Sequence, residues 1–237
     1  MAACAFCGYQ GKLTKEDAWP TWLMEYLWPP TKGMAKTWGT GKGARGKWKV
    51  GYNLRLKTMT LCAECNNEWL GLFEKRSKAK LRGWISGLHG PVTRAELELL
   101  AFWAAKTAMT VDLAHPSGRR KIPADQLREL HDNRTYPPVG IHIWVALRVV
   151  RYPGIGHTAR DFKFQYLDRQ AVVPTLKVRD GYQVIYSIGH LEIHILGLGV
   201  WDADPLELLP DYVALLVSPD TPFYRLWPLN KVPILVS

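Results

Sequence analysis

The sequence predicts an α+β protein in two parts, a cysteine-bearing module over residues 1–90 and an α+β domain over residues 91–237. All four cysteines of the 237-residue chain lie in two Cys-x-x-Cys pairs near its start. Residues 93–114 carry apolar side chains at helical spacing, and from residue 139 onward the apolar period changes to two. Helices followed by successive strands indicate a second domain with two helices and a largely antiparallel sheet.

The cysteine pairs are the most specific feature of the sequence. Two residues between thiols let both sulfurs of a pair reach one ion, and two pairs complete the tetrahedral thiolate shell of structural zinc. Two disulfides or a lone redox pair are the alternatives. A helix-like segment, residues 66–74, follows the second pair, and no secretion signal precedes the first, which favours metal. We therefore predict a structural zinc ion held by Cys4, Cys7, Cys62 and Cys65.

The charge of the chain is concentrated in the first part. The formal net charge is +10, and residues 1–90 contain 15 Lys and Arg against 6 Asp and Glu. This excess predicts a polyanionic partner, with nucleic acid as the leading candidate; a solvated lysine surface is the alternative. The hydrophobic content of 47% excludes a disordered chain, and no stretch approaches 18 uncharged apolar residues. We expect a cytoplasmic protein.

Between the cysteine pairs the sequence predicts short elements. Thr14 with Asp17 resembles a capping box, which predicts a helical turn. Apolar residues recur at helical spacing from Trp19 to Leu27, and Pro29-Pro30 ends that run. Residues 31–60 hold eight Lys and Arg and no acidic residue. Residues 47–59 roughly alternate, so we expect a hairpin strand that leads to the second cysteine pair.

A basic surface for nucleic acid is predicted from two segments. The first is rich in glycine and can follow a phosphate backbone while tryptophan stacks on a base. The second, residues 75–82, ends the helix that begins near the second cysteine pair, where cations also suit the negative end of the helix dipole. The candidate contacts are Lys42, Arg45, Lys47, Trp48, Lys49, Lys75 and Arg76.

The second part begins after Gly87, Gly90 and Pro91. Thr93 with Glu96 forms a capping box before a helix that extends to about residue 114. A second helix begins near Pro123 and ends before residues 137–138. Its predicted strands cover residues 139–150, 161–167, 181–188, 190–197, 212–217 and 223–227. The predicted apolar face of the first helix consists of Leu97, Leu100, Ala101, Ala104, Ala108 and Val111.

His190, Glu192 and His194 form a second candidate group. Alternation along a strand places all three on one face. They form either a zinc or acid–base site, supported by Asp202 or Asp204, or the solvent-facing side of a half-buried strand, which is the simpler interpretation.

Two Cys-x-x-Cys pairs, the first followed by a hairpin and the second running into a helix, describe a treble-clef zinc module. With residues 13–23 (LTKEDAWPTWL) and 61–69 (LCAECNNEW), the first third of the chain resembles the zinc-bearing branch of the HNH endonucleases of bacteria and their phages. The resemblance implies metal-dependent cleavage of nucleic acid, most simply duplex DNA.

The resemblance also implies site residues. The acidic ligand for Mg or Mn falls on Glu16, and the later ligand on Asn66 or Asn67. The general-base histidine of the family falls on Asp17, and the family's middle asparagine has no counterpart except the displaced Asn53. Aspartate is a weaker base than histidine by more than about two pKa units, so the centre is altered or degenerate. The alternative is a non-catalytic regulator or defence-related adaptor, with the module as scaffold and the C-terminal sheet binding a protein or small ligand.

Overall fold

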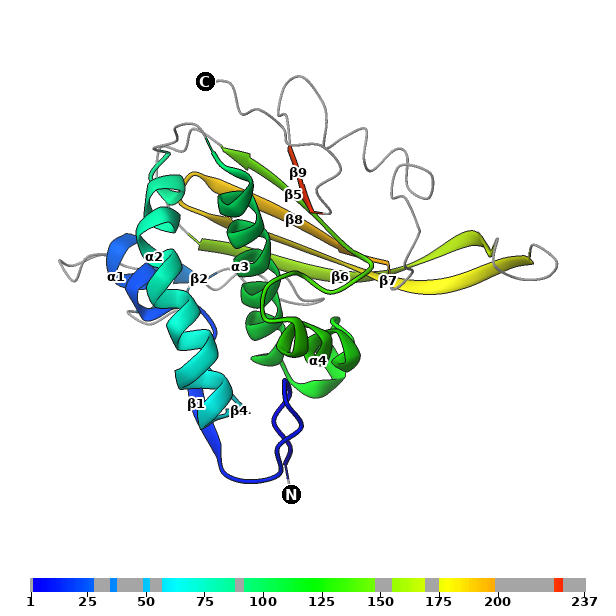
Figure 1. Cartoon of the computed structure of the whole chain (residues 1–237), viewed down its shortest axis with the longest axis horizontal. Coiled ribbons are helices and arrows are strands. Elements are labelled where there is room, and N and C mark those ends of the chain that lie inside the picture. Colours follow the sequence, from blue (N-terminus) through cyan, green and yellow to red (C-terminus); the bar gives the residue numbers. More distant parts are fainter. Residues whose placement is uncertain are drawn as a thin grey trace.

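The computed structural model describes residues 2–27, 35–37, 49–51, 57–87, 92–147, 155–168, 175–198 and 224–227. One long helix, α3 (Arg94–Leu113), lies between the cysteine-bearing part and a five-stranded antiparallel sheet (Figure 1). The predicted α+β class is confirmed. Of the basic segment over residues 31–60, residues 31–34, 38–48 and 52–56 lie outside the described residues.

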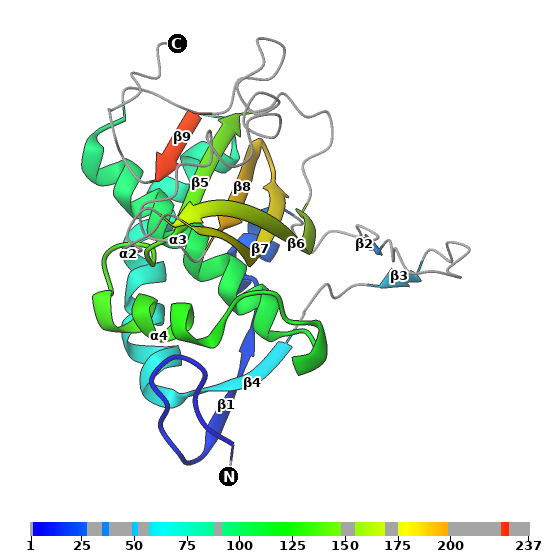
Figure 2. The ribbon, with the colours of Figure 1, turned by 90° about the vertical axis from the view of Figure 1, so that its right-hand side faces the viewer.

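The cysteine-bearing part is built around two paired strands and a long helix. Strand β1 (Leu13–Asp17) runs antiparallel to β4 (Lys57–Cys62), at the lower end of Figure 2. Between them in sequence lie α1 (Thr21–Leu27), β2 (Ala35–Thr37) and β3 (Lys49–Gly51), and the last two pair with each other. The predicted strand over residues 47–59 thus corresponds to β3 and the start of β4, with residues 52–56 outside the described part.

The prediction of a helical turn at Thr14 is wrong. Thr14 lies within β1, and its hydroxyl donates to the Leu61 carbonyl of β4 over 3.0 Å instead of capping a helix. The pattern of a capping box is short, and pairing with a strand distant in the sequence overrides it.

The second cysteine pair leads into a continuous helical segment. A π-helical turn, η1 (Glu64–Leu70), passes directly into α2 (Gly71–Ile85). The Gly71 N–H contacts the carbonyls of both Asn66 and Glu68, where the wide turn narrows to the α-helix. Such π-helical turns are rare in proteins, and many of those known lie at functional sites.

Helix α3 is the centre of the protein. Its capping box is confirmed: the Glu96 N–H donates to the Thr93 hydroxyl, and the Thr93 N–H donates to the Glu96 carboxylate. Every residue over 100–113 is buried, so the helix has no solvent face there, and the predicted single apolar face is too narrow. A helix enclosed on all sides lies between layers of the fold.

After α3 the chain forms η2 (Ser117–Arg119) and α4 (Ala124–Asn133), which ends at Arg134 in the left-handed conformation with φ 54°. The sheet follows, in the order β6-β7-β8-β5-β9, with all neighbours antiparallel. Its strands are β5 (Ile141–Leu147), β6 (Ile155–Asp168), β7 (Thr175–Ile188), β8 (Leu191–Gly197) and β9 (Tyr224–Trp227). The β6–β7 pair extends beyond the other strands (Figure 1). The predicted strand over 212–217 lies outside the described residues.

The turn between β7 and β8 joins the sheet to α2. Gly189 and His190 form a two-residue hairpin turn, and the His190 N–H donates to the carbonyl of Ile85 at the end of α2 over 2.9 Å. Gly189 has φ +57°, and a Cβ there would lie 2.4 Å from the Ile85 carbonyl oxygen. This close approach requires glycine.

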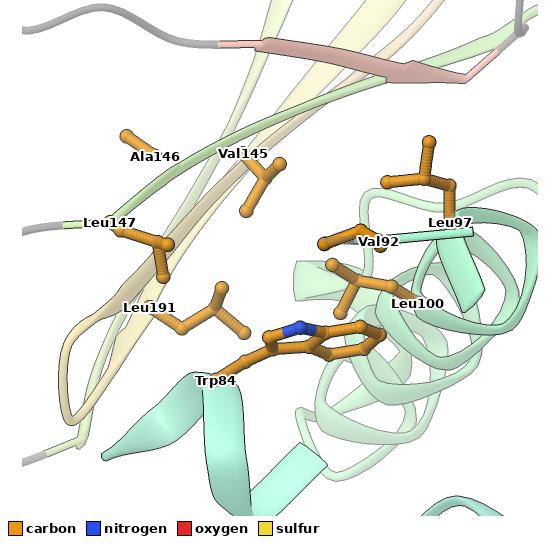
Figure 3. A pocket seen from close by; sticks show the side chains of 8 residues that line it. All are labelled: Trp84, Val92, Leu97, Leu100, Val145, Ala146, Leu147 and Leu191. Atoms are coloured by element: carbon orange, nitrogen blue, oxygen red, sulfur yellow. The ribbon is translucent and has the colours of Figure 1, made fainter. Parts of the chain in front are cut away.

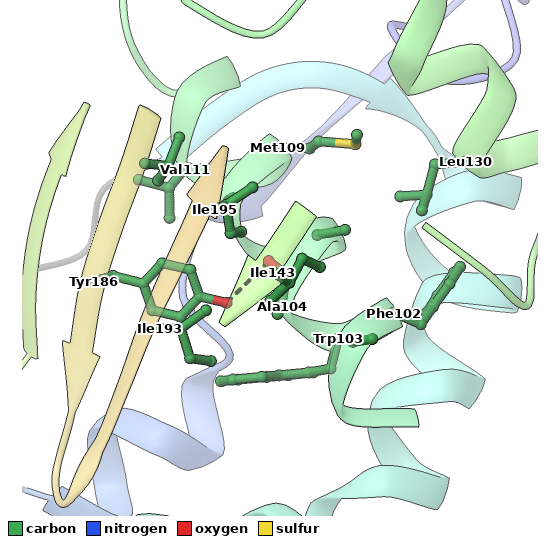
Figure 4. Close-up of a cluster of buried hydrophobic side chains, with 14 of the residues drawn as sticks. Phe102, Trp103, Ala104, Met109, Val111, Leu130, Ile143, Tyr186, Ile193 and Ile195 are labelled. Atoms are coloured by element: carbon green, nitrogen blue, oxygen red, sulfur yellow. Dashed lines mark hydrogen bonds between the residues drawn. The ribbon is translucent and has the colours of Figure 1, made fainter. Parts of the chain in front are cut away.

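A single cluster of buried apolar side chains extends from the cysteines through α3 to the sheet. Tyr186 of β7 donates its hydroxyl to the Ala104 carbonyl of α3 over 2.9 Å, and Ile143, Ile193 and Trp103 surround this bond (Figure 4). The two parts of the chain therefore share one hydrophobic core.

An apolar cavity of about 20 Å³ lies where the end of α2 meets the start of α3 and the sheet (Figure 3). This is close to the space that one water molecule needs. The lining residues are Trp84, Val92, Leu97, Leu100, Val145, Ala146, Leu147 and Leu191. No helix in the described part of the chain has both the length and the apolar character needed to cross a bilayer.

Candidate metal centre and adjoining polar cluster

The structure brings the sulfurs of the four predicted zinc ligands together. The Sγ atoms of Cys4, Cys7, Cys62 and Cys65 all lie within 4.8 Å of one another, and Cys7 and Cys62 are 3.6 Å apart. Four sulfurs placed tetrahedrally at the zinc–sulfur distance of about 2.3 Å are about 3.8 Å apart. All four are free thiols, so the disulfide alternative is not what the structure contains. The donor set fits zinc in number, chemistry and spacing.

The first pair is held in a tight turn. The Cys4 N–H donates to the Tyr9 carbonyl over 2.8 Å, and the Gly8 N–H donates to the Cys4 carbonyl over 2.9 Å. Gly8 follows the second cysteine of the pair with φ +76°, a conformation that glycine adopts without strain. The Ala5 N–H donates to the Thr60 carbonyl over 2.8 Å, which fixes this turn against β4.

The second pair is placed by a strand and a helix start. Cys62 ends β4, and Cys65 lies in the first turn of η1. Backbone N–H groups approach the sulfurs: that of Cys62 lies 3.3 Å from the sulfur of Cys4, and that of Cys65 lies 3.5 Å from the sulfur of Cys62. Such contacts orient thiolates around a metal and stabilise their charge.

The thiols differ in their tendency to ionise. Burial raises the pKa of the Cys4 thiol, but backbone hydrogen bonds from Cys7, Cys62 and Phe6 outweigh it and bring that pKa down to about 7. Burial raises the pKa of Cys7 and of Cys65 above the ordinary thiol value. Four adjoining thiolates repel one another, and a bound dication removes this repulsion.

Glu16 and Asn66, which the resemblance pairs as ligands of Mg or Mn, do lie together. The Asn66 amide hydrogen-bonds the Glu16 carboxyl and also donates to the Thr14 hydroxyl over 3.0 Å. Burial raises the pKa of the Glu16 carboxyl; the Asn66 hydrogen bond and the charge of Lys106 oppose that shift. A half-buried carboxyl with a raised pKa, fixed by an amide, is typical of functional sites and also of buried polar networks.

Three further residues, which the sequence did not predict as site residues, lie in the same polar network as Glu16 and Asn66. The Lys106 ammonium of α3 forms an ion pair with Oε1 of Glu74 on α2, and the Trp22 indole N–H donates to Oε2 of Glu74 over 3.0 Å. The Lys106 side chain is only 6% exposed and that of Glu74 16%. The available signal was one lysine inside an otherwise apolar helical run, residues 101–109 (AFWAAKTAM). We call Glu16, Asn66, Glu74, Lys106 and Trp22 the polar cluster.

Asp17, at the position of the family's general base, has a different partner. Its Oδ1 lies 3.2 Å from the Lys57 ammonium, across the β1–β4 pair. Adjacent residues of a strand point to opposite faces, so Glu16 and Asp17 point apart. An ion-paired carboxylate facing away from Asn66 is a poor candidate for the base that activates water there.

The predicted nucleic-acid contacts are only partly described. Lys75 and Arg76 are exposed on α2. Lys78 and Arg82 of the same helix lie over the Trp22 ring, each 5.9 Å from its centroid. The backbone of Lys49 lies in β3, whereas Lys42, Arg45, Lys47 and Trp48 lie outside the described residues.

The second candidate group divides in two. His190 lies in the β7–β8 turn and not on the strand, so the prediction that it shares a face with Glu192 and His194 is wrong: β8 starts one residue later than predicted. Glu192 and His194 do share a face, and their side chains lie 3.0 Å apart. Both are largely buried, with side-chain exposures of 11% and 12%, so this is not an open solvent-facing strand.

No family model, no curated protein and no solved structure matches this chain.

Proposed function

We propose that this chain is a zinc protein that binds nucleic acid, with duplex DNA as the first candidate, through the basic surface of its N-terminal treble-clef module. The observation that carries the proposal is the placement of exposed cations on a helix that starts at the metal centre. Lys75 and Arg76 lie on α2, which continues from the turn containing Cys65. Phosphate contacts made from such a helix are held rigidly relative to the zinc.

Charge supports the same surface. The 15 Lys and Arg against 6 Asp and Glu of residues 1–90 leave that part strongly basic even after four thiolates bind one dication. The opposite side of α2 is fixed by buried Leu81 and Trp84, so its cations point outward from a packed helix. Nucleic acid is the polyanion that such a surface is best suited to bind.

The resemblance implies two activities, nucleic-acid binding and hydrolysis, and hydrolysis has less support. Metal-dependent cleavage needs Glu16 and Asn66 to hold Mg or Mn and a neighbouring group to accept a proton from water. The group expected to do so, Asp17, is paired with Lys57 on the other face of β1. We therefore propose a degenerate centre, in which the module is used for binding.

A non-catalytic regulator or adaptor is the second candidate, in which the sheet binds a protein or a small ligand. The observation that favours it is the buried Glu192–His194 pair on the sheet face, 3.0 Å apart. Buried charged side chains are uncommon without a structural or binding role.

The test is DNA binding by fluorescence anisotropy at several salt concentrations. Lys75→Ala/Arg76→Ala should weaken binding and lower the log–log salt slope by about 0.9 for each phosphate that the protein no longer neutralises. The matched control is Arg119→Ala/Arg128→Ala, which removes the same charge from exposed positions outside the module. Equal effects of the two variants would mean that net charge, and not this surface, governs binding.

A second variant tests the glycine-rich segment, and the same samples test cleavage. Neutralising Lys42, Arg45, Lys47 and Lys49 together should also flatten the salt dependence. With Mg²⁺ or Mn²⁺ present, we expect no nicking of a supercoiled plasmid by the wild-type protein. Nicking that disappears in Glu16→Ala would refute the degenerate centre and leave the binding proposal standing.

A further inference from the structure

The positive charge in the polar cluster is the ammonium of Lys106, a side chain of the protein. Lys106 reaches from the fully buried part of α3 to Glu74 on α2, and its charge also acts on Glu16 of β1. Its neighbours along the helix include the apolar Trp103, Ala105 and Met109, and no other charged side chain lies within one turn of it. An ammonium is strongly hydrated, and it stays charged in such surroundings only if nearby carboxylates replace its water.

The oxygen donors of the polar cluster are those that a hard divalent cation binds. Glu16 and Glu74 supply carboxylates, and Asn66 has an amide that already hydrogen-bonds Glu16. Mg²⁺ and Mn²⁺ prefer carboxylate and carbonyl oxygens. A dication that entered this cluster would lie next to the Lys106 ammonium, and like charges at that range repel strongly where water is excluded.

We propose that Lys106 is the built-in counter-ion of the Glu16–Glu74 centre and that it keeps Mg²⁺ and Mn²⁺ out of it. This rests on the proposed function, in which Glu16 and Asn66 form a degenerate centre, and it names the residue that makes the centre degenerate. Lys106 is then a specificity-determining residue: the ammonium neutralises the carboxylates without offering a Lewis acid to water.

The experiment measures metal binding without nucleic acid. Full-length zinc-loaded protein is titrated with MnCl₂ at neutral pH, and free Mn²⁺ is followed by electron paramagnetic resonance. The wild-type protein should show no Mn²⁺ site that depends on Glu16. Lys106→Met, which keeps most of the length of the side chain and removes its charge, should gain one site that binds Mn²⁺ at least about 100-fold more tightly than the wild-type protein binds it, and Glu16→Gln added to it should abolish that site.

A matched control separates this effect from loss of any lysine charge. Lys80 forms an ion pair with Glu96 at the surface, where its side chain is 49% exposed, and Lys80→Met should create no Mn²⁺ site. If Lys106→Met does not fold, Lys106→Gln carries the same test with a polar tip. The wild-type titration needs no variant of Lys106.

Two results would overturn the proposal. One is a Mn²⁺ site in the wild-type protein that Glu16→Gln removes; the other is a folded, zinc-loaded Lys106→Met protein that gains no site. Because no arm contains DNA, either result leaves the binding proposal untouched. Likewise, an anisotropy experiment that shows no DNA binding would not change the interpretation of the Mn²⁺ titration.

Discussion

Removing one partner of the Lys106–Glu74 ion pair should lower the free energy of unfolding, whereas removing both charges together should change it little. Lys106→Met leaves the Glu74 carboxylate, 16% exposed, without the ammonium that compensates its burial. Removal of one partner of a buried ion pair typically costs about 3–5 kcal/mol. Trp22 still donates to Glu74 from 3.0 Å, which offsets part of the cost, so we expect about 3 kcal/mol.

The double variant Lys106→Met/Glu74→Gln removes both charges and keeps an amide oxygen for the Trp22 indole. We expect its stability to lie within about 1 kcal/mol of the wild-type value, because buried ion pairs seldom exceed uncharged replacements in stability. The single variants Lys106→Met and Glu74→Gln and the double variant form a double-mutant cycle. The coupling free energy between the two residues should reach about 2 kcal/mol.

The assay is urea unfolding of zinc-loaded protein, followed by far-ultraviolet circular dichroism at fixed zinc concentration. Lys80→Met is the control, since an exposed pair contributes only about 0–1 kcal/mol. A Lys106→Met protein as stable as the wild type would refute the reasoning, because it would show that the ammonium does not compensate a buried charge.

Three further predictions concern the metal, the sheet turn and pH. Cys65→Ser should lose the zinc, measured by elemental analysis, and unfold the N-terminal module, because structural zinc contributes about 10–16 kcal/mol of binding energy to folding. Gly189→Ala should lower the thermal midpoint, measured by calorimetry, because its Cβ would lie 2.4 Å from the Ile85 carbonyl oxygen; retention of the midpoint would contradict that close approach. Burial raises the pKa of Glu16, so its ionisation opposes folding as pH rises above the ordinary carboxyl range; Glu16→Gln should therefore raise the midpoint at pH 8 more than at pH 5, and the reverse order would be evidence against burial of the charge.

Local patterns in the sequence predicted those features whose cause is local. The capping box at Thr93 and the spacing of the four cysteines each need only a few adjacent residues, and the structure contains both. The capping pattern at Thr14 has Asp17 in place of the usual Glu or Gln, and β4 takes Thr14 into a strand pair. The residue that its hydroxyl contacts in that pair lies 47 residues away, so the local pattern does not contain it.

The polar cluster shows a different limit. Glu16 and Asn66 were named together through a resemblance, and the structure brings their side chains into hydrogen-bond contact. Lys106 was missed because a lysine in an apolar helix normally extends to solvent, and only the enclosure of α3 on both sides prevents this. Enclosure depends on where the sheet and the cysteine-bearing part pack against α3, and the periodicity of a single sequence does not contain that information.

The position of α3 also sets an order of assembly during synthesis. Its partners β1, β4, η1 and α2 precede it in the chain, whereas the sheet that covers its other side is completed only by β9, which ends at residue 227. At about 5–20 residues per second, the ribosome needs about 6–23 s to extend the chain from the end of α3 to that point. During this interval α3 can pack on the cysteine-bearing part while the side with Ala104 and Val111 (Figure 4) awaits the sheet. The nascent chain should therefore be most dependent on chaperones after the cysteine-bearing part has folded and before β9 has been made.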